Sequence, residues 1–105
     1  MTAAAHYLLR YDLAPDYLAR RDELRAAHLA LAWEAAGTGA LMLGGAVGDP
    51  IDSALLLFRD YASAEAFAQA DPYVAEGLVT SWRISPWHTV VGADAATPIR
   101  PGAGL

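Results

Sequence analysis

The chain has 105 residues, of which 55% are hydrophobic and 18% are charged, and it contains no cysteine. This length fits a single domain, and the apolar content supplies a hydrophobic core, which excludes intrinsic disorder. The missing cysteines exclude disulfides, thiolate nucleophiles and cysteine-ligated metal centres.

The charge balance limits the partners. All seven basic residues are arginines, and with twelve carboxylates they leave a net charge of −5. Nucleic-acid binders carry basic patches, so no nucleic-acid partner is expected, and the missing lysine excludes Schiff-base and P-loop chemistry. No apolar run reaches the roughly 20 residues of a membrane span, and Met1–Ala5 lacks the features of a signal peptide. We therefore expect a cytoplasmic protein, and the alanine-rich, lysine-free composition is typical of a GC-rich bacterial genome.

The chain begins with a predicted strand and a long predicted helix. His6–Leu13 is short and rich in aromatic and apolar residues, which favours a strand. A run of helix formers without glycine or proline follows over Tyr17–Ala36. Asp16 is placed to cap this helix, and Gly37 ends it.

A hairpin is expected next. Leu41–Leu43, with the small residues after it, and Ala54–Arg59 are predicted strands on either side of a turn at Gly48–Asp52. The pair Gly44-Gly45 lacks the third spaced glycine of a nucleotide-binding loop. It indicates instead a bulge or a close approach of the backbone.

The last predicted elements are a short helix and a strand. Ser63 is the expected cap of the helix, which proline interrupts at Asp71-Pro72 before one more turn. Leu78–Val91 is the fourth strand, and Pro86 favours an edge position because proline cannot donate to a neighbouring strand. Residues 1–91 thus form the domain, and residues 92–105 are expected to be a loose C-terminal tail.

The order β-α-β-β-α-β predicts a ferredoxin-like α+β fold with a four-stranded antiparallel sheet. Two helices cover only one face of such a sheet. The fourth strand carries Trp82, Ile84 and Pro86 on one face and Trp87 and Val91 on the other. Apolar groups on both faces favour a homodimer through the sheet, although scattered surface exposure is the alternative.

One edge of the long helix groups His28 with two arginines. At 100° per residue, the predicted apolar stripe consists of Tyr17, Leu24, Ala27, Leu31 and Ala35. His28 lies at the border of this stripe, with Arg25 one turn and Arg21 two turns before it. A half-buried histidine suits a general acid or base, and arginine suits an anion. Periodicity alone leaves open that His28 only makes a hydrogen bond at the border of the core.

Asp71 is the second candidate, because a carboxylate at the C-terminal end of a helix opposes the helix dipole. The two helices lie side by side in this fold, so a His28–Asp71 hydrogen bond is geometrically feasible and would orient the imidazole. Asp71 also suits the cap of the following turn, and the two roles are compatible. Tyr73 is expected either to line the same cleft and hold a substrate oxygen or to plug the space under the second helix.

No metal or cofactor is expected. His6 and His88 are predicted to be partly exposed polar residues, and no HxH, HExxH or cysteine pattern occurs. The remaining candidates for a functional site are the polar residues near His28.

Several segments together resemble the YciI-like (YCII-related) family, from Tyr7 to Val90. The most specific are Arg-x-x-His-Leu at Arg25–Leu29 and Ala-Asp-Pro-Tyr at Ala70–Tyr73. The resemblance implies a dimeric α+β barrel, in which two ferredoxin-like sheets meet, and a His–Asp active site that falls on His28 and Asp71. One branch of the family dehydrochlorinates a chlorinated hydroxyhydroquinone, and the fold is similar to that of muconolactone isomerases.

Two functional hypotheses follow. The first is a cofactor-independent lyase, dehydrochlorinase-like or isomerase-like, that acts on a small oxygenated, aromatic or lactone-like anion. His28 would be its base, and Arg25 with Arg21 would hold the developing oxyanion. The alternative is a non-catalytic dimeric module that binds a small molecule or has a structural role.

Overall fold

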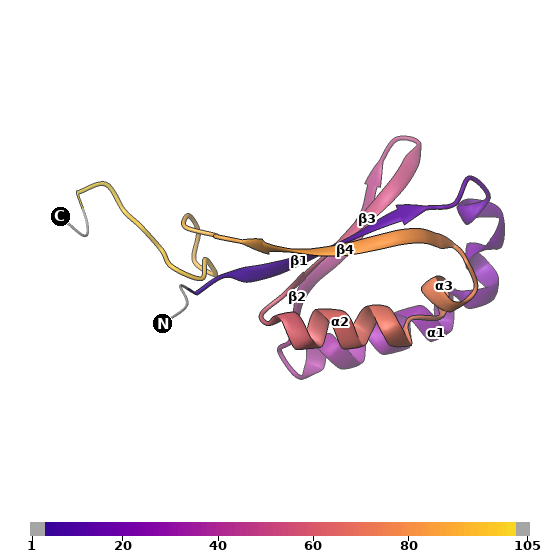
Figure 1. The fold of residues 1–105 in the computed structure, drawn as a ribbon, viewed down its shortest axis with the longest axis horizontal. Helices are drawn as coiled ribbons and strands as arrows, with labels where there is room; N and C mark the ends of the chain where they lie inside the picture. Colours follow the sequence, from indigo (N-terminus) through magenta and orange to yellow (C-terminus); the bar gives the residue numbers. More distant parts are fainter. Residues whose placement is uncertain (1–3, 103–105) are drawn as a thin grey trace.

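The structure is a computed structural model that describes residues 4–102. Its elements follow the predicted β-α-β-β-α-β order, with one additional helical turn (Figure 1). The strands are β1 (His6–Leu13), β2 (Leu41–Gly48), β3 (Ile51–Phe58) and β4 (Val79–Trp87). The helices are α1 (Tyr17–Gly37), α2 (Tyr61–Ala70) and α3 (Pro72–Ala75). The ferredoxin-like α+β prediction is confirmed.

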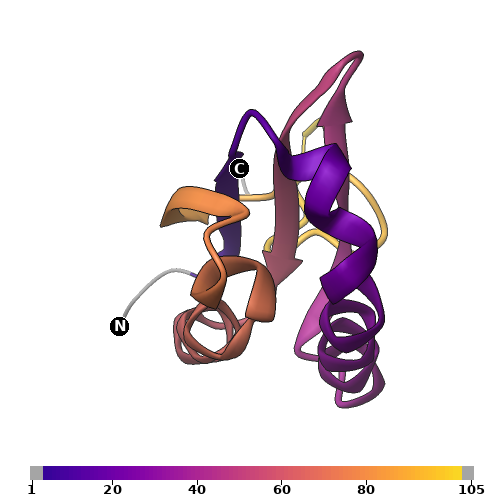
Figure 2. The same ribbon diagram turned by 90° about the vertical axis from the view of Figure 1, so that its right-hand side faces the viewer.

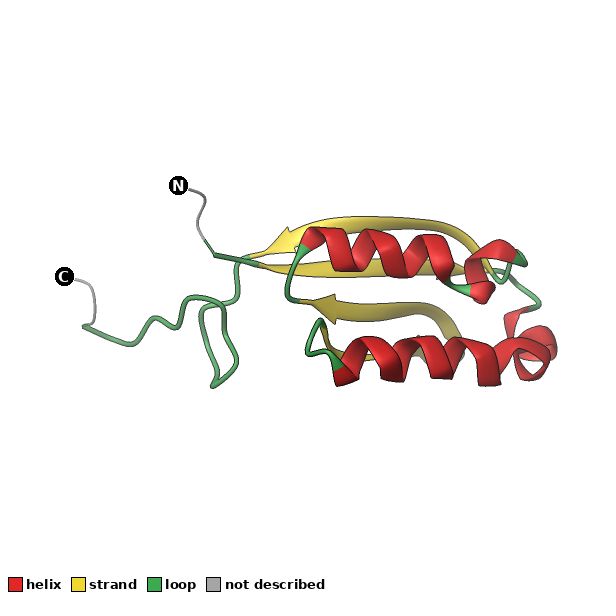
Figure 3. Ribbon diagram, turned by 90° about the horizontal axis from the view of Figure 1, so that it is seen from below, coloured by secondary structure: helices red, strands yellow, loops and turns green. Residues whose placement is uncertain are grey.

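The four strands form one antiparallel sheet in the order β2-β3-β1-β4. The expected hairpin joins β2 to β3, and β4 lies at an edge of the sheet, as Pro86 indicated. Both long helices run along the strands on the same face (Figures 2 and 3). None of the helices in residues 4–102 combines the length and the apolar character that crossing a membrane requires.

The core lies between the sheet and the helices. Alternation along the strands turns Leu9, Leu56 and Phe58 toward the helices, where all three are buried. In the same layer, Gly44 pairs with Leu56, and a Cβ at Gly44 would come within 3.1 Å of the Leu56 Cγ atom. The predicted close approach of the backbone is therefore found at Gly44.

The opposite face of the sheet carries no helix. An apolar row crosses three of its strands, because Leu57 of β3 pairs with Leu8 of β1 and with Leu43 of β2. Leu43 is 67% exposed and Trp87 of β4 is 49% exposed. This open face is the surface that a partner would have to cover.

The inward face of α1 differs from the predicted stripe at one position. Ala27 is exposed, whereas Ala32 packs against the core with Leu24, Leu31 and Ala35. The prediction that Ala27 faces the core was wrong. The inward face of α1 is rotated by one residue, so that His28 is half-buried where Ala27 was expected to be.

Two helix starts show how caps operate in this chain. Helix α2 begins at Tyr61 because the Asp60 carboxylate accepts a hydrogen bond from the Ser63 amide at 2.7 Å. Ser63 is therefore not the cap, and that prediction was wrong. Asp16 does precede α1, but its side chain makes no capping bond and lies 3.9 Å from the Arg20 guanidinium.

Two predicted strand limits need correction. β3 begins at Ile51 rather than Ala54, since the turn between β2 and β3 is tighter than expected. β4 ends at Trp87, so Val91 lies beyond the strand. The reason is the register: Trp87 pairs with His6, the first residue of β1, and β1 offers no further partner.

The chain after β4 extends past the end of the sheet without a regular element (Figure 1). Its backbone turns back on itself, and the Ile99 amide donates to the Val90 carbonyl at 2.8 Å. Thr89 lies with its hydroxyl 2.8 Å from the His6 Nδ1 atom. His6 is consequently buried, contrary to its predicted partial exposure, whereas His88 is exposed.

Candidate active site

Asp71 lies at the junction of α2 and α3, where Pro72 stops one helix and begins the next. Its side chain is completely buried. One carboxylate oxygen accepts a hydrogen bond from the Tyr73 amide at 3.0 Å and thereby caps α3. The capping geometry that the sequence suggested for Asp71 is present.

Two side chains complete the surroundings of Asp71. The Tyr11 hydroxyl of β1 donates to Oδ2 at 2.8 Å. The His28 Nδ1 atom of α1 lies 2.9 Å from Oδ1 and 3.0 Å from Oδ2. The backbone amide, the phenol and the imidazole Nδ1–H are all donors, and the carboxylate offers only acceptors to them. Asp71 therefore keeps the Nδ1 proton on His28 and leaves Nε2 as the unprotonated nitrogen.

Aromatic rings fix the plane of the imidazole. Tyr73 stacks on His28 with ring centroids 3.9 Å apart and an angle of 6° between the planes. Phe67 of α2 meets the same ring edge-on, with centroids 6.1 Å apart. His28 is thus oriented by one hydrogen-bonded carboxylate and two aromatic neighbours.

Both tyrosines near Asp71 stay protonated at neutral pH. Burial, followed by the charge of Asp71, raises the pKa of Tyr11 far above its usual value. Burial, together with Tyr17 and Asp71, raises the pKa of Tyr73 to about 12, although Arg25 and Arg21 act in the opposite direction. Neither phenol is therefore a base at neutral pH, and the Tyr11 hydroxyl donates to Asp71.

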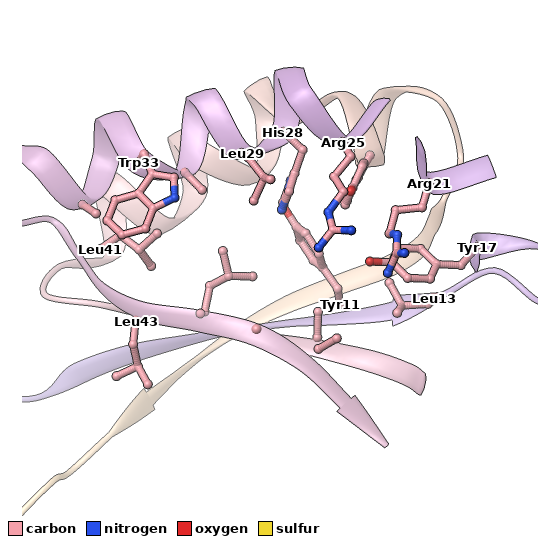
Figure 4. A pocket seen from close by; sticks show the side chains of 18 of the residues that line it. Tyr11, Leu13, Tyr17, Arg21, Arg25, His28, Leu29, Trp33, Leu41 and Leu43 are labelled. Atoms are coloured by element: carbon pink, nitrogen blue, oxygen red, sulfur yellow. The ribbon is translucent and has the colours of Figure 1, made fainter. Parts of the chain in front are cut away.

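A cavity of about 410 Å³ opens between α1 and the strands β2 and β3 (Figure 4). His28 reaches it from α1, and Tyr11 and Tyr73 form part of its wall. Arg21 and Arg25 extend from α1 into the same space, beside the His28 imidazole and the rings of Tyr11 and Tyr73.

The two arginines have few partners within the chain. The Arg21 Nε atom is buried and has no hydrogen-bond partner among the described residues, since the Asp22 carboxylate is 3.7 Å away. Within residues 4–102, no carboxylate lies at ion-pair distance from Arg25. A buried guanidinium nitrogen without an acceptor favours the binding of an anion from solution.

The structure brings together all five residues singled out from the sequence. His28, Asp71 and Tyr73 are in direct contact, and Arg21 and Arg25 line the cavity that His28 reaches. Tyr11 was missed. Its signal was the alternation of β1, which predicts an inward-facing tyrosine whose buried hydroxyl needs a partner.

The described residues offer no alternative metal centre, because no three histidine, aspartate or glutamate side chains among residues 4–102 are grouped closely enough to hold an ion.

Comparisons with known proteins agree with this architecture. The model of the YCII-related domain family matches residues 5–88. Among solved structures, the chain is similar to 5-chloro-2-hydroxyhydroquinone dehydrochlorinase from Burkholderia phenoliruptrix AC1100, determined as a complex with 2,5-dihydroxybenzoquinone. The TM-score is 0.65 and the identity 20%, over 80% of this chain and 94% of the other. No curated protein matches the sequence significantly.

Proposed function

Because the chain belongs to the family of YCII-related domains, we propose that it is an enzyme that uses His28 as a general base on a small oxygenated anion. The reaction is of the lyase type, as in a dehydrochlorinase, or of the isomerase type, and needs no cofactor. The observation that supports this proposal is the environment of His28. Its Nδ1 atom is hydrogen-bonded to the buried Asp71, and its ring borders a cavity that two arginines also line.

The proposed step is a proton transfer. Nε2 of His28 removes a proton from a hydroxyl or from a carbon next to a carbonyl, and Asp71 stabilises the imidazolium that forms. Arg25 and Arg21 hold the developing oxyanion. In a dehydrochlorination, the substrate reacts as its keto tautomer, in which chlorine is on a tetrahedral carbon. The electron pair of the broken O–H or C–H bond forms a new double bond through the ring while the C–Cl bond breaks, so that HCl is lost in total. In an isomerisation, the imidazolium returns the proton to another carbon.

The structural neighbour supports the class of substrate. Its bound 2,5-dihydroxybenzoquinone is a planar ring with several oxygens, and a ring of this kind suits a cavity with guanidinium groups beside an imidazole. At 20% identity the likeness concerns the fold, so the argument for activity rests on the cavity of this chain.

We also propose that two copies associate through their open sheet faces. The apolar row of Leu8, Leu43 and Leu57 runs across three of the four strands of a surface without a helix. A second copy offers the same row, which is what a two-fold interface requires.

Replacement of His28 tests the proposed function. We expect His28→Ala to lower kcat/KM for chloride release from 5-chloro-2-hydroxyhydroquinone by about a hundredfold or more, because the general base is lost. The variant should also lose about 2–3 kcal/mol of unfolding free energy, because the His28 side chain is only 15% exposed, stacks on Tyr73 and is hydrogen-bonded to the buried Asp71. Circular dichroism checks that it remains folded under the assay conditions.

The matched control is His88→Ala, because His88 is exposed and lies outside the cavity. Equal turnover in the two variants contradicts the proposal. If the wild-type protein binds 2,5-dihydroxybenzoquinone with an affinity that depends on Arg25 but turns over no ring substrate, the site is that of a binding module.

A further inference from the structure

The chemistry of the cavity changes along α1. One end carries the polar groups Arg21, Arg25 and His28. Beyond Leu29 the lining is apolar and consists of Ala32, Trp33, Ala36 and Leu41 (Figure 4). The proposed proton transfer uses only the polar end, so the apolar end has no role in that step.

Large apolar side chains at this end are open to solvent. Trp33 is 74% exposed, although its indole extends from α1 toward Leu41 across the end of the cavity. Leu29, one turn earlier, is 41% exposed. Single exposed apolar residues are common, but a tryptophan and a leucine that rim a cavity together are typical of a ligand-binding surface.

The volume of the cavity exceeds that of a single ring. A cavity of roughly 150 Å³ holds a benzene molecule, and this cavity measures about 410 Å³. Arg25 and Trp33 lie eight positions apart on one helix, which separates them by roughly 12 Å along the axis. A ring bound at the arginines therefore leaves the space near Trp33 unfilled.

We propose that the substrate is an amphiphilic oxyanion, with an oxygenated head at Arg21, Arg25 and His28 and an apolar substituent that lies along Leu29 and under Trp33. Of the roughly 12 Å between the two ends, the ring of the head occupies about half, and the remainder corresponds to an extended substituent of about five carbons. The position of the head rests on the proposed function, whereas the apolar subsite rests on the residues of α1 and β2.

Two series of probes test the apolar subsite by calorimetric titration. The first is 2,5-dihydroxybenzoquinone with hydrogen, methyl, propyl, pentyl or heptyl at one ring carbon, and the second is the linear carboxylates from acetate to decanoate. We expect each methylene that becomes buried to lower Kd by about fourfold, up to a plateau at about five carbons. Trp33→Ala should flatten this dependence in both series and leave the affinity for the unsubstituted head within about twofold.

Leu18→Ala is the matched control, because Leu18 is an exposed leucine of α1 outside the cavity, whereas Leu29→Ala changes a similar residue inside it. The inference is wrong if affinity does not rise with chain length, if the rise survives Trp33→Ala, or if Leu18→Ala removes it equally. A chain-length dependence without any His28-dependent turnover supports the apolar subsite and contradicts the proposed function. His28-dependent turnover of the unsubstituted ring without a chain-length dependence supports the proposed function and contradicts the apolar subsite.

Discussion

The same Asp71 carboxylate both caps a helix and orients the His28 imidazole. It caps α3 through the Tyr73 amide and it holds the His28 imidazole, while Tyr11 donates to the same carboxylate. All three partners are donors, so the site is satisfied only by a group with acceptors in every direction. A buried carboxylate of this kind orients the imidazole by a direct contact.

Asp71→Asn should show how strict this requirement is. The amide places an NH₂ group against at least one donor, which leaves buried groups unsatisfied and costs about 2–3 kcal/mol of unfolding free energy. Urea denaturation measures this loss, and the His28-dependent turnover should disappear because the tautomer is no longer held. Tyr11→Phe, which removes only one donor, is the milder comparison and should cost about 1 kcal/mol. Equal stability of Asp71→Asn and the wild type would contradict this account of the site.

The two buried phenols predict a loss of stability in alkali. Their pKa values are raised in the folded state, to about 12 for Tyr73, whereas in the unfolded chain they ionise near 10. Above pH 10 the unfolded state therefore releases protons that the folded state retains. The unfolding free energy should be insensitive to these groups below pH 10 and should fall from pH 10 to 12.

Urea midpoints between pH 8 and 12 measure this effect, and Tyr73→Phe should reduce the slope above pH 10. The exposed Tyr61, which lies outside the cavity, offers the control Tyr61→Phe. A slope that does not change in Tyr73→Phe but changes in Tyr61→Phe contradicts the assignment.

At the scale of elements, the two long helices are attached to the sheet in different ways. Helix α2 contributes Ala64, Phe67 and Ala68 to the core, all of them buried. In α1 only Tyr17 is buried, and Leu24, Leu31, Ala32 and Ala35 pack partly buried against the core. The side of α1 that carries Arg21, Arg25 and His28 lines the cavity instead.

The starts of the two helices give a matched pair of substitutions. Asp60→Ala removes the hydrogen bond to the Ser63 amide and should cost about 1 kcal/mol of unfolding free energy. Asp16→Ala should cost markedly less, since Asp16 makes no capping bond with α1. Urea denaturation of both variants checks the difference. Equal losses would show that the cap of α2 does not depend on the Asp60 side chain.

At the scale of the whole molecule, the sheet has one face covered by helices and one that is open (Figure 2). The open face combines the apolar row of Leu8, Leu43 and Leu57 with the polar residues Arg10 and Asp12. Such a surface suits an interface with an apolar centre and a charged rim.

Leu57→Arg should disrupt the proposed dimer. The substitution places an unpaired charge in the centre of the interface and should raise the dimer Kd by about a hundredfold or more. Sedimentation over a range of concentrations measures this change, and Leu18→Arg on the exposed side of α1 is the control. A wild-type protein that sediments as a monomer at micromolar concentration contradicts the proposed dimer.

Much of the fold follows from local sequence signals. Alternation and helix formers predict the order of the elements, Pro86 predicts an edge strand, and Gly44 predicts a close approach. Each of these signals acts on the backbone of its own segment, so no knowledge of the rest of the chain is needed. The pairing of His28 with Asp71, which lie 43 positions apart in the chain, needs more than local signals. The predicted fold makes the bond feasible because its two helices lie side by side, and the resemblance to the family implies the pair.

Other features depend on distances between elements and appeared only in the tertiary structure. The burial of His6 depends on Thr89 at the other end of the chain, and the role of Tyr11 depends on where Asp71 ends α2. Trp33 belongs to the cavity because the packing of α1 over β2 and β3 leaves a space that both Trp33 and Leu41 border. Periodicity tells which side of a helix is apolar, but the distance between that helix and the sheet results from the packing of all the elements together.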